Sequence, residues 1–379
     1  MKILIAGDFC DRYRVSDKIR EGLYSFLFDE VKPIIEEADY SFVNFEFPIV
    51  LNEGEPIPKC GPNLKGQEKS IDAIKYAGFN ACTLANNHIL DQGEKCCIDT
   101  KRLLEDAGIN TVGAGKSLEE ASEILYLKKD KEVLAVINCC EHEFSISTET
   151  SAGANPLNPI QQFYKIQEAK KNADYVLVIV HGGHEHFQLP SPRMKETYRF
   201  FIDAGADAVV NHHQHCYSGY ELFKGKPIFY GLGNFCFDIY PIRNNDLWNY
   251  GYMVELEFNN DILSLFKIIP YKQCDEIVGV HLLDKNEFSD NIAELNYIIG
   301  DISTLRKNTD NYYRESSSFI RTVFEPLQNR IMLGLQRRQL MPSFLSLKHL
   351  LKIENYTLCE SHIDKVKYFL EKNRKKQLS

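Results

Sequence analysis

The sequence predicts an α/β fold with a central parallel sheet. Strand-like and helix-like patterns alternate as far as about residue 240, which is typical of a chain whose helices connect the strands of a sheet. Residues 175–180 form a continuous apolar run, as expected of a strand that is buried on both faces. Helical patterns dominate after about residue 275, so we expect a helical extension to follow the α/β part.

Apolar runs that end at polar or glycine-containing turns predict the strands. In chain order they are expected at residues 2–6, 41–45, 81–84, 131–137, 175–180, 208–210 and 228–230. Two further strands, at 251–258 and 262–269, flank an Asn259-Asn260-Asp261 turn, which predicts an antiparallel hairpin.

Helices are predicted between these strands. They are expected at residues 31–38, 69–76, 95–107 and 193–204. Pro33 is compatible with the first turn of its helix, and a glycine follows each of the other three, as is common at helix C-termini. The extension is expected to contain helices at 289–307, 316–336, 345–353 and 362–372. We therefore predict a domain at 1–272 and a helical extension at 273–379, with a solvated basic terminus at 365–376.

Composition narrows the classes of protein that fit. The chain has 379 residues, 44% hydrophobic and 26% charged, and a net charge of −9, which gives no support for binding nucleic acid or an anionic membrane. Its eleven cysteines show no disulfide spacing and fit reduced core thiols. The apolar opening is too short for a signal peptide, and no run approaches the roughly 18 apolar residues of a membrane helix. We expect a soluble cytoplasmic protein of unknown oligomeric state.

Five polar clusters follow predicted strands, and they indicate a metal site. They lie at residues 7–10, 44–48, 85–91, 181–185 and 211–215. Open α/β sheets build their sites at the carboxyl ends of their strands, so these clusters are expected to converge. Imidazole, carboxylate and carboxamide groups suit borderline or hard divalent metals. The clusters therefore predict a metal-dependent hydrolase.

Each cluster offers a candidate and also a structural interpretation. Asp8 can ligate a metal or cap a turn. Glu46 shares a strand face with Asn44, so both can face the site, and its structural alternative is a strand-end glutamate in solvent. Asn87 offers a carboxamide oxygen, and Asp91 can orient His88, unless this segment caps the next helix.

The two histidine clusters give the stronger signal. His181 ends an apolar strand, Glu185 can support a ligand or orient substrate, and at least one of His184 and His186 is expected in solvent. His213 and His215 share a face if the segment is extended, with His212 on the other face. A surface histidine run is the alternative.

The order of these motifs resembles the bacterial capsule synthesis protein CapA family, which is related to the calcineurin-like metallophosphoesterases. The matching stretches are G-D at 7–8, N-x-E-x-P at 44–48, A-N-N-H-x-x-D-x-G at 85–93, H-x-G-x-E at 181–185, H-H-x-H at 212–215 and G-L-G-N-F at 231–235. The resemblance implies a four-layer α/β/β/α sandwich of the metallophosphoesterase type around a dinuclear metal site. It implies the ligands Asp8, Glu46, Asn87, His181, His213 and His215, with Glu46 bridging. His88 resembles the histidine that contacts a phosphoryl oxygen or leaving group, and Asp91 resembles its partner.

One departure from the phosphoesterase pattern concerns the first metal. Cys10 stands where phosphoesterases carry a histidine, so this metal lacks a ligand unless a Cys10 thiolate or water replaces it. The leading hypothesis is a hydrolase with two divalent ions, Mn, Fe or Zn, that acts on a small or polymeric substrate such as a phosphoester or polyglutamate. Two alternatives stay open: a non-hydrolytic accessory in capsule polymer assembly or export, and a degenerate fold with one structural metal.

Overall fold

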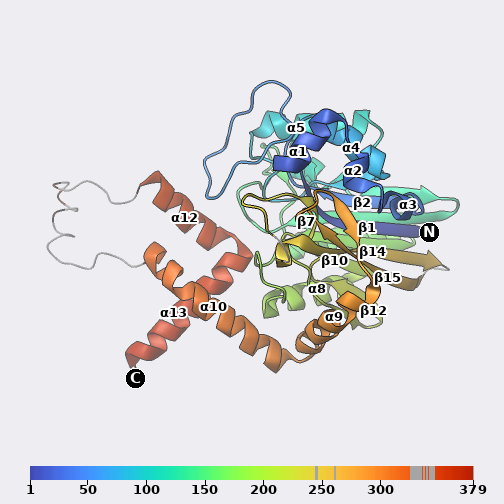
Figure 1. Ribbon diagram of the computed structural model, residues 1–379. Helices are drawn as coiled ribbons and strands as arrows, with labels where there is room; N and C mark the ends of the chain where they lie inside the picture. Colours follow the sequence, from blue (N-terminus) through green and yellow to red (C-terminus); the bar gives the residue numbers. More distant parts are fainter. Residues whose placement is uncertain are drawn as a thin grey trace.

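The computed structural model describes residues 1–243, 246–259, 262–324, 335, 338, 340 and 346–378. Two β-sheets pack face to face, and helices cover the outer face of each, so the predicted α/β/β/α sandwich is confirmed (Figure 1). The C-terminal helices are also confirmed, and α10, α12 and α13 lie together beside the sandwich.

The first sheet carries the N-terminal half of the site. Its order is β16-β15-β14-β1-β2-β3-β4, and its β1 and β2 are central. The parallel strands are β1 (Lys2–Cys10), β2 (Tyr40–Phe45), β3 (Ala81–Thr83) and β4 (Asn110–Val112). The predicted hairpin is present as β14 (Tyr250–Asn259) and β15 (Ile262–Gln273), with β16 (Val280–Leu282) at the edge. A short strand, β13 (Asn234–Phe237), pairs in parallel with the end of β1.

The second sheet carries the histidine half of the site. Its order is β11-β12-β10-β9-β7-β6, with β9 and β10 at the centre. Its strands are β6 (Leu125–Lys129), β7 (Glu132–Cys140), β9 (Tyr175–His181), β10 (Ala208–His212), β11 (Tyr220–Phe223) and β12 (Lys226–Phe229). A separate two-stranded ladder joins β5 (Ala114–Gly115) to β8 (Gly153–Ala154).

Two hydrophobic cores hold the layers together. One lies between the first sheet and its helices α1 (Tyr13–Glu21), α2 (Ser25–Phe28), α3 (Lys32–Glu36), α4 (Lys69–Ala77) and α5 (Glu94–Asp106). The other fills the space between the sheets and continues under α7 (Pro159–Asn172) and α8 (Pro192–Ala204). The short segments α6 (Leu118–Ala121) and η1 (Leu247–Asn249) complete the helices of this part.

The central strands run further than the apolar pattern predicts. β1 continues to Cys10, β9 to His181 and β10 to His212, and His181 and His212 face each other in the parallel ladder. Polar cluster residues thus take part in the sheets, because their backbone groups still pair although their side chains are not core residues. The sequence missed α1, α7 and the short strands at the edges.

The C-terminal helices are α9 (Lys285–Gly300), α10 (Ile302–Phe324), α12 (Leu347–Leu358) and α13 (Glu360–Leu378). Much of the helix predicted at 316–336 lies outside the described residues. Phe288, Ile292 and Leu305 join the core beneath the second sheet, so α9 and the start of α10 pack on the sandwich. The division at residue 272 stays a prediction.

The expectation of a solvated terminus beginning at Lys365 was wrong. The Lys365 ammonium lies 4.8 Å from the centre of the Tyr312 ring, and both residues line a cavity. The basic composition of this segment indicated a solvated terminus. In the structure α13 packs against α10 and α12, and charge composition alone does not predict such tertiary contacts.

The remaining global expectations concern cysteines and membranes. All eleven cysteines are unpaired, and ten of them are buried, which fits reduced core thiols. Within the described residues, none of the helices has the length and apolar character needed to cross a bilayer.

A close approach of β1 to the β13 segment gives the first prediction. A Cβ atom added to Gly7 would lie 1.8 Å from the Gly233 carbonyl oxygen. We expect Gly7→Ala to lower the free energy of unfolding by about 3 kcal/mol, because two backbones would have to separate. Chemical denaturation followed by circular dichroism measures this change.

The matched control is Gly300→Ala. Nothing lies within 4 Å of the Cβ position at Gly300, so the same substitution there should change stability by less than about 1 kcal/mol. Equal stabilities of the two variants would contradict the packing of β1 against Gly233.

Candidate metal centre

Adjacent strands of the first sheet place three polar side chains together. Asp8 and Asn44 are partners in the β1–β2 ladder. The Asn44 amide donates to Asp8 Oδ1 at 2.7 Å and to Glu46 Oε2 at 3.3 Å, and all three side chains are fully buried. Phe45 and Phe47 point into the core on the opposite face. The predicted alternation along this strand is therefore confirmed, and the solvent-exposed interpretation of Glu46 is wrong.

The second sheet brings its histidines to the same point. His181 Nε2 lies 3.0 Å from His213 Nδ1 and 3.0 Å from the Asn87 carboxamide oxygen. The His213 backbone N–H donates to Asp8 Oδ2 at 3.2 Å, which links the two sheets. These residues are all at most 6% exposed, so the surface-run interpretation is wrong.

His213 and His215 share the site for a reason other than the predicted one. Their φ angles are +89° and +54°, so the segment is not extended. Two left-handed residues turn the chain back towards Asp8 as β10 ends. Among the described residues, His212 belongs to neither group of possible ligands, and its Nε2 lies 3.0 Å from the Ala6 carbonyl oxygen on β1.

Glu46 is the centre of the cluster. Glu46, His181 and His213 form one group whose ligand atoms lie within 4.8 Å of one another, and Asp8, Glu46 and His215 form a second. In the part of the chain that the structure describes, Glu46 Oε1 has no hydrogen-bond partner, and it lies 3.8 Å from His181 Nε2 and 3.7 Å from His215 Nε2. This buried oxygen thus lies near one histidine of each group.

The charge of the cluster fits a bound cation. Among the described residues, neither Asp8 nor Glu46 forms a salt bridge with lysine or arginine. Burial, reinforced by Asp8, raises the pKa of Glu46 well above its usual value. Burial lowers the pKa of His215 to about 4, so this ring is neutral near pH 7, as a metal ligand must be. Buried carboxylates either take up protons or are balanced by a positive charge, and divalent cations would supply that charge here.

Cys10 does not replace the histidine of the phosphoesterase pattern. Its side chain lies in the hydrophobic core with Phe9, on the helix side of the first sheet. Burial raises the pKa of the thiol well above its usual value, which disfavours a thiolate. Among the described residues, Cys10 belongs to neither ligand group.

His88 is held by an acid and a lysine. Asp91 Oδ2 lies 2.6 Å from His88 Nδ1 and accepts the Leu64 backbone N–H at 2.6 Å. Lys59 Nζ forms a salt bridge with Asp91 Oδ1 and lies 3.2 Å from His88 Nδ1. Burial and Lys59 lower the pKa of His88, although Asp91 opposes them. The helix that follows, α5, has Gly93 as its N-cap and no side-chain cap, so the capping interpretation of this segment is wrong.

Glu185 and two histidines flank the ligands. Glu185 and His186 are exposed, whereas His184 is buried and its Nε2 lies 2.9 Å from the Tyr313 hydroxyl. The expectation that at least one of His184 and His186 is in solvent is therefore confirmed.

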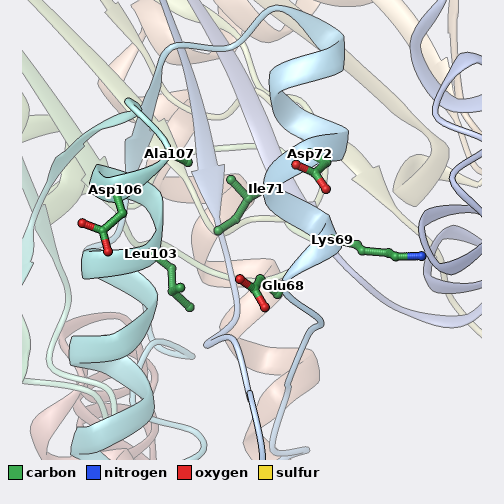
Figure 2. A pocket seen from close by; sticks show the side chains of 7 residues that line it. All are labelled: Glu68, Lys69, Ile71, Asp72, Leu103, Asp106 and Ala107. Atoms are coloured by element: carbon green, nitrogen blue, oxygen red, sulfur yellow. The ribbon is translucent and has the colours of Figure 1, made fainter.

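A cavity of about 400 Å³ borders this centre at Asn87. Asn87, His88 and Glu185 form part of its wall, so it leads to the candidate ligands. A larger hollow of about 570 Å³ lies elsewhere, between α4 and α5, where Glu68, Asp72 and Asp106 make it acidic (Figure 2). That hollow contains no member of either ligand group, so the site chemistry favours the smaller cavity.

Several residues of the site were not predicted from the sequence. Glu143 accepts a hydrogen bond from the Asn87 amide at 3.1 Å, and it follows β7. The same strand-end signal that found the other clusters could have found it. Lys59 lies in a loop of prolines and glycines, and Tyr312 and Lys365 come from the extension, so no local pattern pointed to these three.

The sequence that carries these motifs is similar to the members of a known protein family. The sequence model described as "Bacterial capsule synthesis protein PGA_cap" matches residues 2–239. The "Capsule biosynthesis protein CapA" of Bacillus anthracis is 30% identical over 278 residues, which cover 71% of this chain and 67% of that protein. The "PGA biosynthesis protein CapA" of Bacillus subtilis (strain 168) is 33% identical over 247 residues, which cover 64% of each chain. The chain thus spans about two thirds of the length of these relatives.

Solved structures of similar shape are more distant. A novel phosphatase from Mycoplasma pneumoniae has a TM-score of 0.43 and 15% identity, with 73% of this chain and 94% of that chain covered. A putative 5′-nucleotidase from Staphylococcus aureus has a TM-score of 0.42 and 14% identity, with coverage of 78% and 58%. The family match extends over more than half of the sequence and includes every residue of the candidate centre. The chain belongs to the bacterial capsule synthesis protein family PGA_cap.

Proposed function

We propose that this protein is a metal-dependent hydrolase of phosphoesters or related esters. The observation that carries the proposal is the unpartnered Glu46 Oε1, which lies between two groups of buried ligands. An isolated buried carboxylate oxygen is costly, and a shared cation pair would satisfy it. The names of the family and its members concern capsule synthesis, so hydrolysis is our inference from the residues of the site.

The ligand groups suggest how two cations would be held. Glu46, His181 and His213, with the Asn87 oxygen beside His181, would hold one ion. Asp8, Glu46 and His215 would hold the other, with Glu46 bridging. Mixed imidazole and carboxylate ligands suit Mn, Fe or Zn. Two ions with a shared carboxylate also account better for both groups than one structural ion does.

His88 is the residue most suited to act on the substrate. Divalent ions in this centre would act as Lewis acids towards an ester oxygen and lower the pKa of water. Asp91 and Lys59 fix the His88 ring at the floor of the cavity, where it can donate a hydrogen bond to an oxygen that gains charge. Glu185, on the rim, would orient the substrate.

A second candidate function is a non-hydrolytic role in capsule polymer assembly or export. The names of relatives favour it, among them a "Probable polyglutamine synthesis accessory protein" of Mycobacterium tuberculosis (strain ATCC 25618 / H37Rv), 30% identical over 259 residues. Deletion of the gene followed by capsule staining tests this role. A loss of polymer that a variant without hydrolase activity restores would favour it over hydrolysis.

Metal content tests the proposed centre. We expect the purified protein, reconstituted with Mn, Fe or Zn, to bind about two ions and to hydrolyse p-nitrophenyl phosphomonoesters or diesters. His181→Ala should remove at least one ion and lower kcat/KM by at least about 100-fold, because His181 contacts both Asn87 and His213. Plasma mass spectrometry and a colorimetric assay measure the two effects.

The control for the metal experiment is His281→Ala. His281 lies on β16, where it pairs with Glu30 at 2.9 Å, far from the ligand groups in the sheet order. The His281→Ala variant should keep both the bound metal and the hydrolase activity. A wild-type protein without bound metal and without turnover under any added ion would refute the hydrolase proposal.

The role of His88 gives a separate prediction. His88→Asn should lower kcat by about 100-fold to 10,000-fold while metal content stays unchanged, because His88 belongs to neither ligand group of the described residues. Asp91→Asn should lower kcat less, since an amide oxygen in the place of Asp91 Oδ2 can still accept from Leu64 and His88, while the salt bridge with Lys59 is lost. A His88→Asn variant with normal kcat would exclude His88 from the chemistry.

A further inference from the structure

The cavity that borders the metal centre is completed by the C-terminal helices. One wall comes from the sandwich, including Lys59, His88 and Glu143. The opposite wall comes from Tyr312 on α10, Asn355 on α12, and His362 and Lys365 on α13. These last four residues lie beyond residues 2–239, so they are outside the segment that the family model matches.

Polar contacts fix the position of this second wall. Arg193, at the start of α8, binds Asp364 at 2.8 Å and Glu141 at 2.7 Å. His142 Nδ1 lies 2.6 Å from Glu360, the first residue of α13. Salt bridges with buried partners are rigid because breaking them leaves a charge without a partner. Lys365, one residue after Asp364, is therefore held in a defined place.

The charged side chains of the cavity differ in whether they have partners. Lys59 binds Asp91, and Glu143 accepts from the Asn87 amide. The His362 ring contacts the Asn355 oxygen at 3.0 Å, lies 3.8 Å from the Glu143 carboxylate and stacks on Tyr356. Among the described residues, no carboxylate lies within salt-bridge distance of the Lys365 ammonium. The ammonium lies over the face of Tyr312, and burial lowers its pKa, although Glu185 and Glu143 oppose this at longer range.

We propose that the Lys365 ammonium, with His362 beside it, binds a second anionic group of the substrate, away from the group at the metal centre. This inference rests on the proposed hydrolase function and adds a substrate class: molecules with two anionic groups, a carboxylate or phosphate being the second. A half-buried cation without a counterion is costly, and a substrate anion would supply its partner.

The net charge of the cavity agrees with an anionic ligand. On the wall, Lys59 is paired with Asp91, and Lys365 balances one of the two carboxylates of Glu143 and Glu185. Below them, the four positive charges of two divalent cations would exceed the two negative charges of Asp8 and Glu46 by two. The floor would then be positive, and Tyr312 would keep the Lys365 stem in place beneath the bound anion.

Binding of matched phosphonates tests the inference. Calorimetry on the Mn-loaded full-length protein would compare benzylphosphonate, 4-carboxybenzylphosphonate and 1,4-phenylenebis(methylphosphonate). We expect at least one of the two ligands with a second anion to bind about tenfold or more tightly than benzylphosphonate. The preferred ligand identifies the second group as carboxylate or phosphonate. Lys365→Met should abolish the preference and leave benzylphosphonate affinity unchanged, since methionine keeps an apolar stem over Tyr312.

The control variant is Lys367→Met, on the same helix at an exposed position. It should retain the wild-type preference, and thermal melting should show that both variants are folded. Equal binding of all three ligands by a wild-type protein that still hydrolyses phosphoesters would overturn this inference alone. A wild-type protein that neither binds benzylphosphonate nor hydrolyses phosphoesters would overturn the hydrolase proposal as well.

Discussion

The structure depends on how the negative charge of two buried carboxylates is compensated. Asp8 and Glu46 lie fully buried where the two sheets meet, and their closest basic neighbours are histidines rather than lysine or arginine. Burial lowers the pKa of His181 and His215, so neutral rings cannot balance the charge. Either the carboxylates take up protons or a cation enters. The first option agrees with the raised pKa of Glu46, and the second with its unpartnered oxygen.

The two sheets are needed together to build this arrangement. The first sheet supplies Asp8 and Glu46, and the second supplies His181 and the turn that carries His213 and His215. The bond from the His213 backbone to Asp8 joins the sheets at the ligands themselves. A shift of one sheet over the other would therefore alter the distances between ligands before it exposed much of the core. Packing between the sheets sets the metal geometry as much as the ligand residues do.

Much of the fold and most of the centre could be predicted from the sequence. Parallel strands give continuous apolar runs, and polar residues at their ends converge by topology, which is how Glu46 and His181 were found. The left-handed turn at His213 and His215 could not be read from the pattern, because it depends on the contact with Asp8. Lys59 and Lys365 were missed for the same reason: each reaches the site from a segment whose own pattern indicates only a loop or a charged helix.

The two walls of the cavity suggest that chemistry and selectivity are encoded separately. All candidate ligands, and His88 with Asp91, lie within the segment that the family shares. Tyr312, His362 and Lys365 lie outside it, on helices anchored through Arg193 and His142. A change in these helices would alter the second wall, and it would reach the candidate ligands through Glu143, which lies 3.8 Å from His362 and 3.9 Å from His213. Members with the same centre can therefore differ in substrate, and identity over the shared segment alone does not transfer a substrate from one member to another.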